Sequence, residues 1–130
     1  MIKLYFITLF VFLGLDSIWL LFIAKSYYAE KLGYLMAKNP NLIAALIFYL
    51  LFVVGMVVFV LNPALKNNSL SQAIILGAFL GLVSYSTYDL TNLATIRDWP
   101  LIITIIDMIW GTVLSGAVAG ISFSIYKWLA

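Results

Sequence analysis

The sequence contains no cysteine and no histidine, and only 9% of its residues are charged. Without thiol and imidazole groups the chain cannot form disulfides, thiolate nucleophiles, ordinary zinc or iron-sulfur sites, or a histidine-ligated haem. A bound metal would have to be a hard cation held by oxygen ligands. We therefore predict no cofactor and no metal site.

Charge of either sign is scarce. Seven basic and five acidic residues give a net charge of +2, too small and too scattered for a surface that binds nucleic acid. A soluble domain carries about 25% charged residues. Here 65% of the residues are hydrophobic, and several apolar runs are long enough to cross a hydrocarbon core of about 30 Å. The composition predicts an all-α integral membrane protein with one small domain, residues 1–130.

Four membrane-spanning helices are predicted, at about residues 4–24, 42–61, 70–89 and 101–128. The first follows Lys3 but lacks the cleavage site of a secretory signal, so we expect it to be retained. Three of the boundaries carry helix start or stop signals: Asn39 with Pro40, the "NPALKNN" break at Pro63, and the capping-box spacing of Ser69 and Gln72. These helices predict a four-transmembrane-helix bundle.

An even number of spans places both termini on one side of the membrane, called side A here, together with the loop around residues 62–69. The loops after the first and third spans then lie on the other side, side B. Side B carries four basic residues and side A three, and the N-terminal amine removes that difference. The positive-inside rule therefore leaves the orientation undetermined.

Two apolar spans share the pattern D-x-I-W, in "LDSIWL" and "IDMIWG". At 1.5 Å per residue, Asp16 lies roughly 12 Å and Asp107 roughly 9 Å from side B, so the two carboxyl groups share a depth. Trp19 and Trp110 follow at i+3, on the same helix face as the aspartates. A charge inside a span costs at least about 2.5–3.5 kcal/mol unless it has a partner or a cavity. The pattern predicts either a polar pocket or a polar network joining the helices.

Polar and aromatic residues recur at helical spacing where the third span approaches side B: Tyr85, Tyr88, Asp89 and Asn92. Asp89 would either join the same site or face the lipid headgroups. Arg97 would pair with Asp89 or Asp107, or extend to lipid phosphate. We expect Asp98 to cap the fourth helix. The other aromatic residues near span ends are expected to be interfacial anchors: Tyr27, Tyr28, Trp99, Tyr126 and Trp128.

Small residues indicate where helices pack closely. Gly77 and Gly81 have G-x-x-x-G spacing on the third span, and the fourth span carries a row of Gly111, Ser115, Ala119 and Ser122. Thr104 and Asp107 extend this row, which would bring Asp107 against another helix. Gly116 and Gly120 lie on an adjacent face and suggest a further helix contact or a homodimer.

The stretches "YSTYDLTNLATIRDWP", "IDMIWG" and "LDSIWL" resemble an uncharacterised bacterial family of predicted four-helix membrane proteins, domain of unknown function 2177. The resemblance covers essentially the whole chain. It implies a small multi-pass protein of the bacterial inner (cytoplasmic) membrane, and it implies no activity. The recurrent polar positions that it implies are Asp16, Trp19, Tyr85, Tyr88, Asp89, Asn92, Asp98, Trp99, Asp107 and Trp110.

We expect a protein that binds, and as a further step transports, a small cationic or amphipathic molecule or a proton. The expected binding residues are Asp16, Trp19, Tyr85, Tyr88, Asp89, Asn92, Arg97, Asp107 and Trp110. Its partners would be membrane lipid and the small ligand. One alternative is a structural or accessory subunit whose acids fix helix registry. Another is intramembrane hydrolysis by two aspartates sharing a proton, but the motifs of known enzymes of that kind are missing. We therefore predict no catalytic residue.

Overall fold

The computed structural model describes residues 1–35 and 41–130, and these residues are helical, with no strand in either range. Four helical stretches in this part are long and apolar enough to cross a membrane: Ile2–Phe22, Leu42–Lys66, Leu70–Thr95 and Leu101–Leu129. The predicted all-α fold with four spans is therefore confirmed.

The first span is longer than its apolar sequence suggested. Helix α1 (Ile2–Ile18) passes into the π-helical segment η1 (Trp19–Ala24) and then into α2 (Lys25–Leu32). The polar residues after Ala24, expected to form a loop, thus continue the helix by eight residues. No proline or glycine occurs between Ala24 and Gly33 to end the helix.

The second span is α3 (Leu42–Gly55), η2 (Met56–Leu61) and α4 (Asn62–Lys66). The start signal predicted at Asn39 and Pro40 lies outside the described residues. The observed N-cap is Asn41, whose side chain accepts a hydrogen bond from the backbone N–H of Ala44 at 3.1 Å.

Pro63 does not end the second span as expected. A proline lacks a backbone N–H, and its ring clashes with the carbonyl four residues earlier in a regular helix. Here Pro63 lies in the first turn of α4, where the missing N–H costs nothing, directly after the wider π-helical turns of η2. The helix therefore accommodates Pro63 and continues to Lys66.

The third span, α5 (Leu70–Thr95), begins as predicted, because the Ser69 hydroxyl accepts from the backbone N–H of Gln72 at 3.1 Å. The helix ends at Thr95, whereas the predicted span ended six residues earlier, at Asp89. The hydroxyl groups of Thr87 and Thr95 bond back to the carbonyls of Val83 and Thr91 at 2.7 and 2.8 Å. Bonds of this kind satisfy the polar side chains within the helix, so the polar sequence does not end it.

The fourth span is α6 (Leu101–Leu129), and Asp98 does not cap it as predicted. The N-cap position is Pro100, with no side-chain cap. Asp98 lies two residues earlier, in the left-handed backbone region at φ 61°. Its carbonyl instead accepts a hydrogen bond from the Tyr34 hydroxyl at 2.7 Å, which joins the two side B loops.

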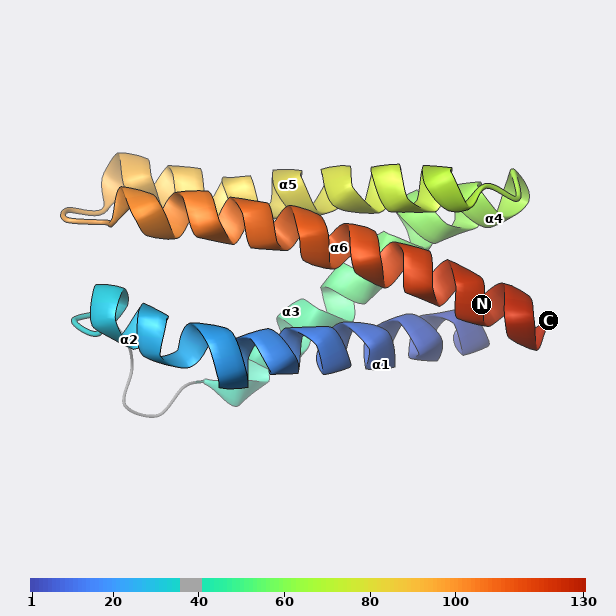
Figure 1. The fold of residues 1–130 in the computed structure, drawn as a ribbon, viewed down its shortest axis with the longest axis horizontal. Helices are drawn as coiled ribbons and strands as arrows, with labels where there is room; N and C mark the ends of the chain where they lie inside the picture. The colour runs from blue at the N-terminus through green and yellow to red at the C-terminus, as the bar shows by residue number, and fades with distance from the viewer. Residues whose placement is uncertain (36–40) are drawn as a thin grey trace.

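The termini lie together at one end of the bundle, and α2 and the loop between α5 and α6 lie at the other (Figure 1). The Lys3 ammonium contacts the carbonyl of Leu129 at 3.4 Å at the side A end. Helices α5 and α6 form the most extensive pair, and α1 packs on α6. The second span crosses the bundle diagonally: α3 contacts α1, whereas η2 and α4 contact α5 (Figure 1).

Glycine permits the close approach of α5 and α6. A Cβ atom on Gly77 would lie 2.6 Å from the Cβ of Ala119, and one on Gly81 would overlap the backbone oxygen of Gly111. The adjacent face that carries Gly116 and Gly120 also meets α5, at Ile74 and Ala78. Both small-residue rows of α6 therefore serve the same helix pair.

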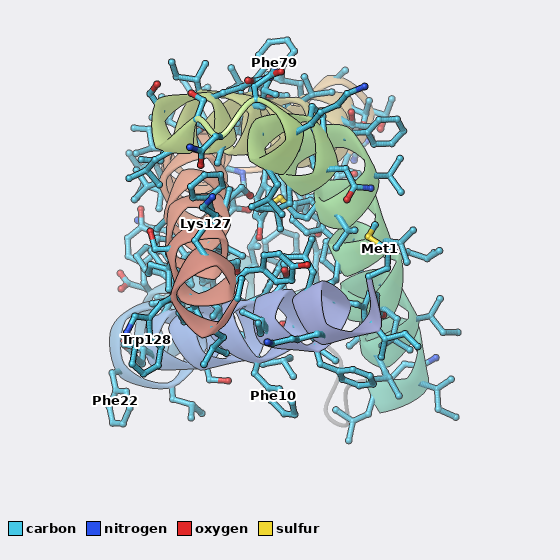
Figure 2. All side chains as sticks on the ribbon, turned by 90° about the vertical axis from the view of Figure 1, so that its right-hand side faces the viewer. Met1, Phe10, Phe22, Phe79, Lys127 and Trp128 are labelled. Atoms are coloured by element: carbon cyan, nitrogen blue, oxygen red, sulfur yellow. The ribbon has the colours of Figure 1, made fainter. Side chains whose placement is uncertain are left out.

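The apolar core fills the half of the bundle nearer side A. Its members come from all four spans: Leu4, Phe12, Phe52, Val53, Met56, Val57, Val60, Leu61, Ala64, Ala73, Leu114, Val118, Ala119 and Phe123. Other aromatic side chains, such as Phe10 and Phe79, point outward from the bundle, as expected where helices face acyl chains (Figure 2). The side B half is filled differently.

Candidate functional site

A cavity of about 450 Å³ lies in the side B half of the bundle. We call it the carboxyl cavity, because both aspartates of the D-x-I-W pattern line it. All four spans and α2 contribute to its walls: Asp16, Trp19, Leu20, Tyr28, Leu32, Phe48, Tyr49, Tyr85, Asp107 and Trp110.

Asp16 faces inward because it continues the buried stripe of α1. That stripe repeats every four residues, through Leu4, Thr8 and Phe12. The Asp16 side chain is 7% exposed, and its Oδ2 accepts a hydrogen bond of 2.5 Å from the hydroxyl of Tyr49. Since Tyr49 belongs to α3, this bond joins the first and second spans beside the cavity. Hydrogen bonds to carboxylates are among the strong ones in proteins.

Asp107 reaches the cavity from α6. It follows Thr104 by one turn and precedes Gly111 by another, on the buried face of the helix. Asp107 is 9% exposed, so protein covers most of this residue. The expectation from depth that Asp16 and Asp107 meet at one level agrees with their shared cavity.

The two tryptophans of the pattern stack on each other. The rings of Trp19 and Trp110 are 4.3 Å apart between centroids and 12° from parallel. Trp19 is the first residue of η1, and Trp110 lies one turn beyond Asp107, so the stack joins the first and fourth spans. The indole N–H of Trp110 is buried and has no hydrogen-bond partner.

Tyr85 reaches the carboxyl cavity across a glycine. A Cβ atom on Gly111 would overlap the Tyr85 ring, so the ring lies directly against the α6 backbone at this point. The same ring lines the carboxyl cavity and a second, smaller cavity. The absence of a side chain at Gly111 therefore allows the Tyr85 ring to lie at this point.

The second cavity has a volume of about 290 Å³ and adjoins the first. We call it the lateral cavity, since it lies between α3 and α5. It is lined by Phe48, Ser84, Tyr85, Tyr88 and Asp107. Three of these residues, Phe48, Tyr85 and Asp107, also line the carboxyl cavity.

Three expected site residues line neither cavity: Asp89, Asn92 and Arg97. Asp89 is fully buried near α6, where its carbonyl accepts from the Thr104 hydroxyl at 3.3 Å. Neither of its carboxyl oxygens has a hydrogen-bond partner among the described residues. Asp89 is therefore not paired with Arg97, which was one of the expectations for Arg97. Arg97 is exposed in the loop before α6.

Trp99 is not an exposed interfacial anchor as expected. It is 8% exposed, and its indole N–H donates to the Thr104 hydroxyl at 3.0 Å. Its ring also meets Tyr88 edge to face, with centroids 5.9 Å apart. Because Thr104 contacts Asp89 as well, this group fixes the side B end of the pair α5 and α6.

The sequence did not indicate any contribution from the second span or α2. Phe48, Tyr49 and Tyr28 line the carboxyl cavity, together with Leu20 and Leu32. The sequence could have indicated Tyr49 as a site residue, because it carries the only hydrogen-bonding side chain between Leu42 and Leu61. Tyr28 was expected to be an interfacial anchor and instead faces the cavity.

The charges and rings of the carboxyl cavity fit a positively charged group. Two carboxyl groups line it, and no lysine or arginine does among the described residues. Aromatic rings attract cations through the negative faces of their π systems, and four tyrosine or phenylalanine rings accompany the indole stack. Serine and histidine nucleophile pairs are excluded by the sequence, which has no histidine.

This arrangement defines a small polytopic membrane protein with a polar, aromatic cavity near one face of the bilayer. The chain belongs to the predicted membrane protein family DUF2177, whose model matches residues 1–124. The resemblance stated from the motifs is thereby confirmed. Neither the comparison with curated proteins nor that with solved structures found a match.

Proposed function

We propose that this protein binds a small cationic or amphipathic molecule in the carboxyl cavity. The observation that carries the proposal is the position of Asp16 and Asp107 in one cavity of about 450 Å³ with aromatic walls. Small-molecule sites are typically clefts of about 300–1,000 Å³ with mainly apolar walls and a few placed polar groups. The cavity has that size and composition.

Binding is better supported than transport. The cavity lies in the side B half, whereas the side A half is filled by the apolar core around Phe12, Met56 and Leu114. A route across the membrane would require that core to open. The proposed binding therefore needs only the cavity in the side B half. Transport of the molecule or a proton would require a second conformation.

The test uses purified protein in phosphatidylcholine nanodiscs and benzyltrimethylammonium as the probe. This cation combines a ring with a quaternary ammonium, and neopentylbenzene has the same shape without the charge. Calorimetry should detect saturable binding of the cation and no comparable binding of the neutral molecule. The double variant Asp16→Asn and Asp107→Asn should weaken the cation's affinity about tenfold or more, since it removes the Coulomb attraction between the ammonium and two carboxyl groups.

Asp98→Asn provides the matched control, because it removes a carboxyl group that lies in the side B loop and lines neither cavity. Asparagine also tolerates the left-handed backbone at this position. The Asp98→Asn variant should bind the probe with the same affinity as the natural chain. Equal binding of the charged and neutral probes, or binding indifferent to loss of both cavity aspartates, would refute the proposed function.

An accessory structural role is the second candidate, and the bond between Tyr49 and Asp16 favours it. This bond joins two spans that share few polar contacts. In a purely structural role the aspartates would only fix the registry of the helices, and no ligand would depend on them. Co-purification of one defined membrane partner that survives their replacement by asparagine would support this candidate.

A further inference from the structure

We infer that the ligand of the carboxyl cavity is a cationic amphipath that reaches it sideways from the bilayer, through the lateral cavity between α3 and α5. Its charged head would lie beside Asp107, and its apolar tail would pass between Phe48 and Tyr88 toward the acyl chains. This inference rests on the proposed binding function and adds the class of ligand and its route.

The first observation is the path of the second span. Because it crosses the bundle diagonally, its main contacts with α5 are made by η2 and α4, near side A. Helix α3 instead lies beside α1 (Figure 1). The two helices therefore diverge toward side B, and the lateral cavity occupies the region where they have separated.

The second observation is that the two cavities adjoin and share three lining residues. Asp107, Tyr85 and Phe48 line both of them, so a molecule in one is within reach of the other. Asp107 is the acid nearest this connection, and Ser84 adds a hydroxyl on the side of α5. The combination of one carboxyl and one hydroxyl group suits a head that carries a positive charge and donates hydrogen bonds.

The third observation concerns the outer rim. Phe48 is 46% exposed and Tyr88 is 57% exposed, so the lateral cavity extends to the outer surface of the bundle. Phe48 lies six residues into α3 and Asp107 six residues into α6, which places each about 9 Å below the side B end of its helix. Half of a hydrocarbon core is about 15 Å thick. Helix α6 has 29 residues and is roughly 43 Å long, so with equal overhang at its two ends the rim lies just inside the acyl chains, beside the headgroups, where the tail of an amphipath enters the bilayer.

The experiment exploits the absence of cysteine from the chain. Ser84→Cys introduces one thiol in the lateral cavity, and benzyl methanethiosulfonate then attaches a plug through a disulfide that dithiothreitol removes. The membrane-borne probe is an alkylammonium with a dansyl group, placed in phosphatidylcholine liposomes. Its binding is followed by energy transfer from the tryptophans of the carboxyl cavity. The water-soluble probe is benzyltrimethylammonium.

We expect the plug to weaken saturable binding of the alkylammonium about tenfold or more, and reduction to restore it. Affinity for benzyltrimethylammonium should change less than about twofold, because that probe needs only the carboxyl cavity, which a plug in the lateral cavity leaves free. Val83→Cys is the matched control, since Val83 is an exposed neighbour on α5 that lines neither cavity. Its plugged form should bind both probes normally. Tyr88→Cys offers a second attachment point at the rim if the Ser84 variant does not fold.

Undiminished alkylammonium binding with the plug in place would overturn the lateral route. Equal loss of both probes would overturn it too, since the lateral cavity would then have no separate role. The proposed function fails in a different way, namely if the unmodified protein binds neither probe. The two failures are therefore distinguishable in one set of samples.

Discussion

The same four spans fill the two halves of this bundle in different ways. Toward side A, apolar side chains from all four spans interlock into one core, whose members are almost completely buried. Toward side B, the spans carry carboxyl, phenol and indole groups around two adjoining cavities. The difference teaches that one short helix bundle can pack one half tightly and leave adjoining cavities in the other. The second span takes part in both halves differently, because α3 contacts α1 toward side B whereas η2 and α4 contact α5 toward side A.

The largest expected effect is in the side A core. Phe12 is 0% exposed and meets Tyr49 and Phe52 edge to face. Phe12→Ala should lower the free energy of unfolding by about 3 kcal/mol or more, because it leaves a cavity that neighbours cannot fill. Reversible unfolding in mixed micelles measures this loss.

Phe10 is the matched control, two residues earlier on the same helix and 68% exposed (Figure 2). Phe10→Ala should change the free energy of unfolding by about 0.5 kcal/mol at most, as surface substitutions usually do. Similar losses in the two variants would break the comparison, since the core would then contribute no special stability.

An intermediate effect is expected where the two halves meet, at Gly111. Gly111→Ala places a methyl group in the volume of the Tyr85 ring, and the backbone of α6 cannot retreat from α5. We expect a loss of about 1–3 kcal/mol in unfolding free energy. A displaced Tyr85 should also weaken binding of benzyltrimethylammonium, as measured by calorimetry.

Gly14→Ala tests the same substitution where nothing lies within 4 Å of the new methyl group. It should stabilise the protein by about 0.5–1 kcal/mol, because alanine loses less backbone entropy in a helix than glycine does. If Gly111→Ala behaved like Gly14→Ala, Tyr85 would not depend on Gly111 for its position.

The smallest expected effect compares two tyrosine hydroxyls, one in each half. Tyr49→Phe removes the bond to Asp16 and should cost about 1–2 kcal/mol, since the acceptor is a carboxyl group. Tyr5→Phe removes a 3.2 Å bond to the carbonyl of Leu50 near side A and should cost about 0.5 kcal/mol. Unfolding in mixed micelles measures both, and a larger loss at Tyr5 would contradict the division of roles between the halves.

Much of the fold followed from hydropathy and depth. Four apolar runs fixed the number of spans, and rise per residue placed Asp16 and Asp107 at one level, where a shared cavity is observed. The small-residue rows indicated the close pair α5 and α6. These features depend on local composition and helix geometry, which a sequence states directly.

Other features depend on how helices cross, and the sequence did not state them. Because of the π-helical turns before Pro63, the second helix continues beyond the end that the sequence predicted. The diagonal path that brings Tyr49 to Asp16 and separates α3 from α5 also arises from helix crossing. Asp98 was misjudged for a related reason, because its bond with Tyr34 comes from a distant position in the sequence. Trp99 was misjudged although its partner Thr104 is only five residues away, because the sequence does not state that the loop turns the indole inward.

The stack of Trp19 on Trp110 gives this protein an optical signature of its own. Two indole rings stacked with centroids 4.3 Å apart couple electronically, so the pair should contribute an exciton-shifted band to the near-ultraviolet absorption. That band exists only while the first and fourth spans keep their mutual register. The register can therefore be followed spectroscopically in intact membranes, without attaching any dye.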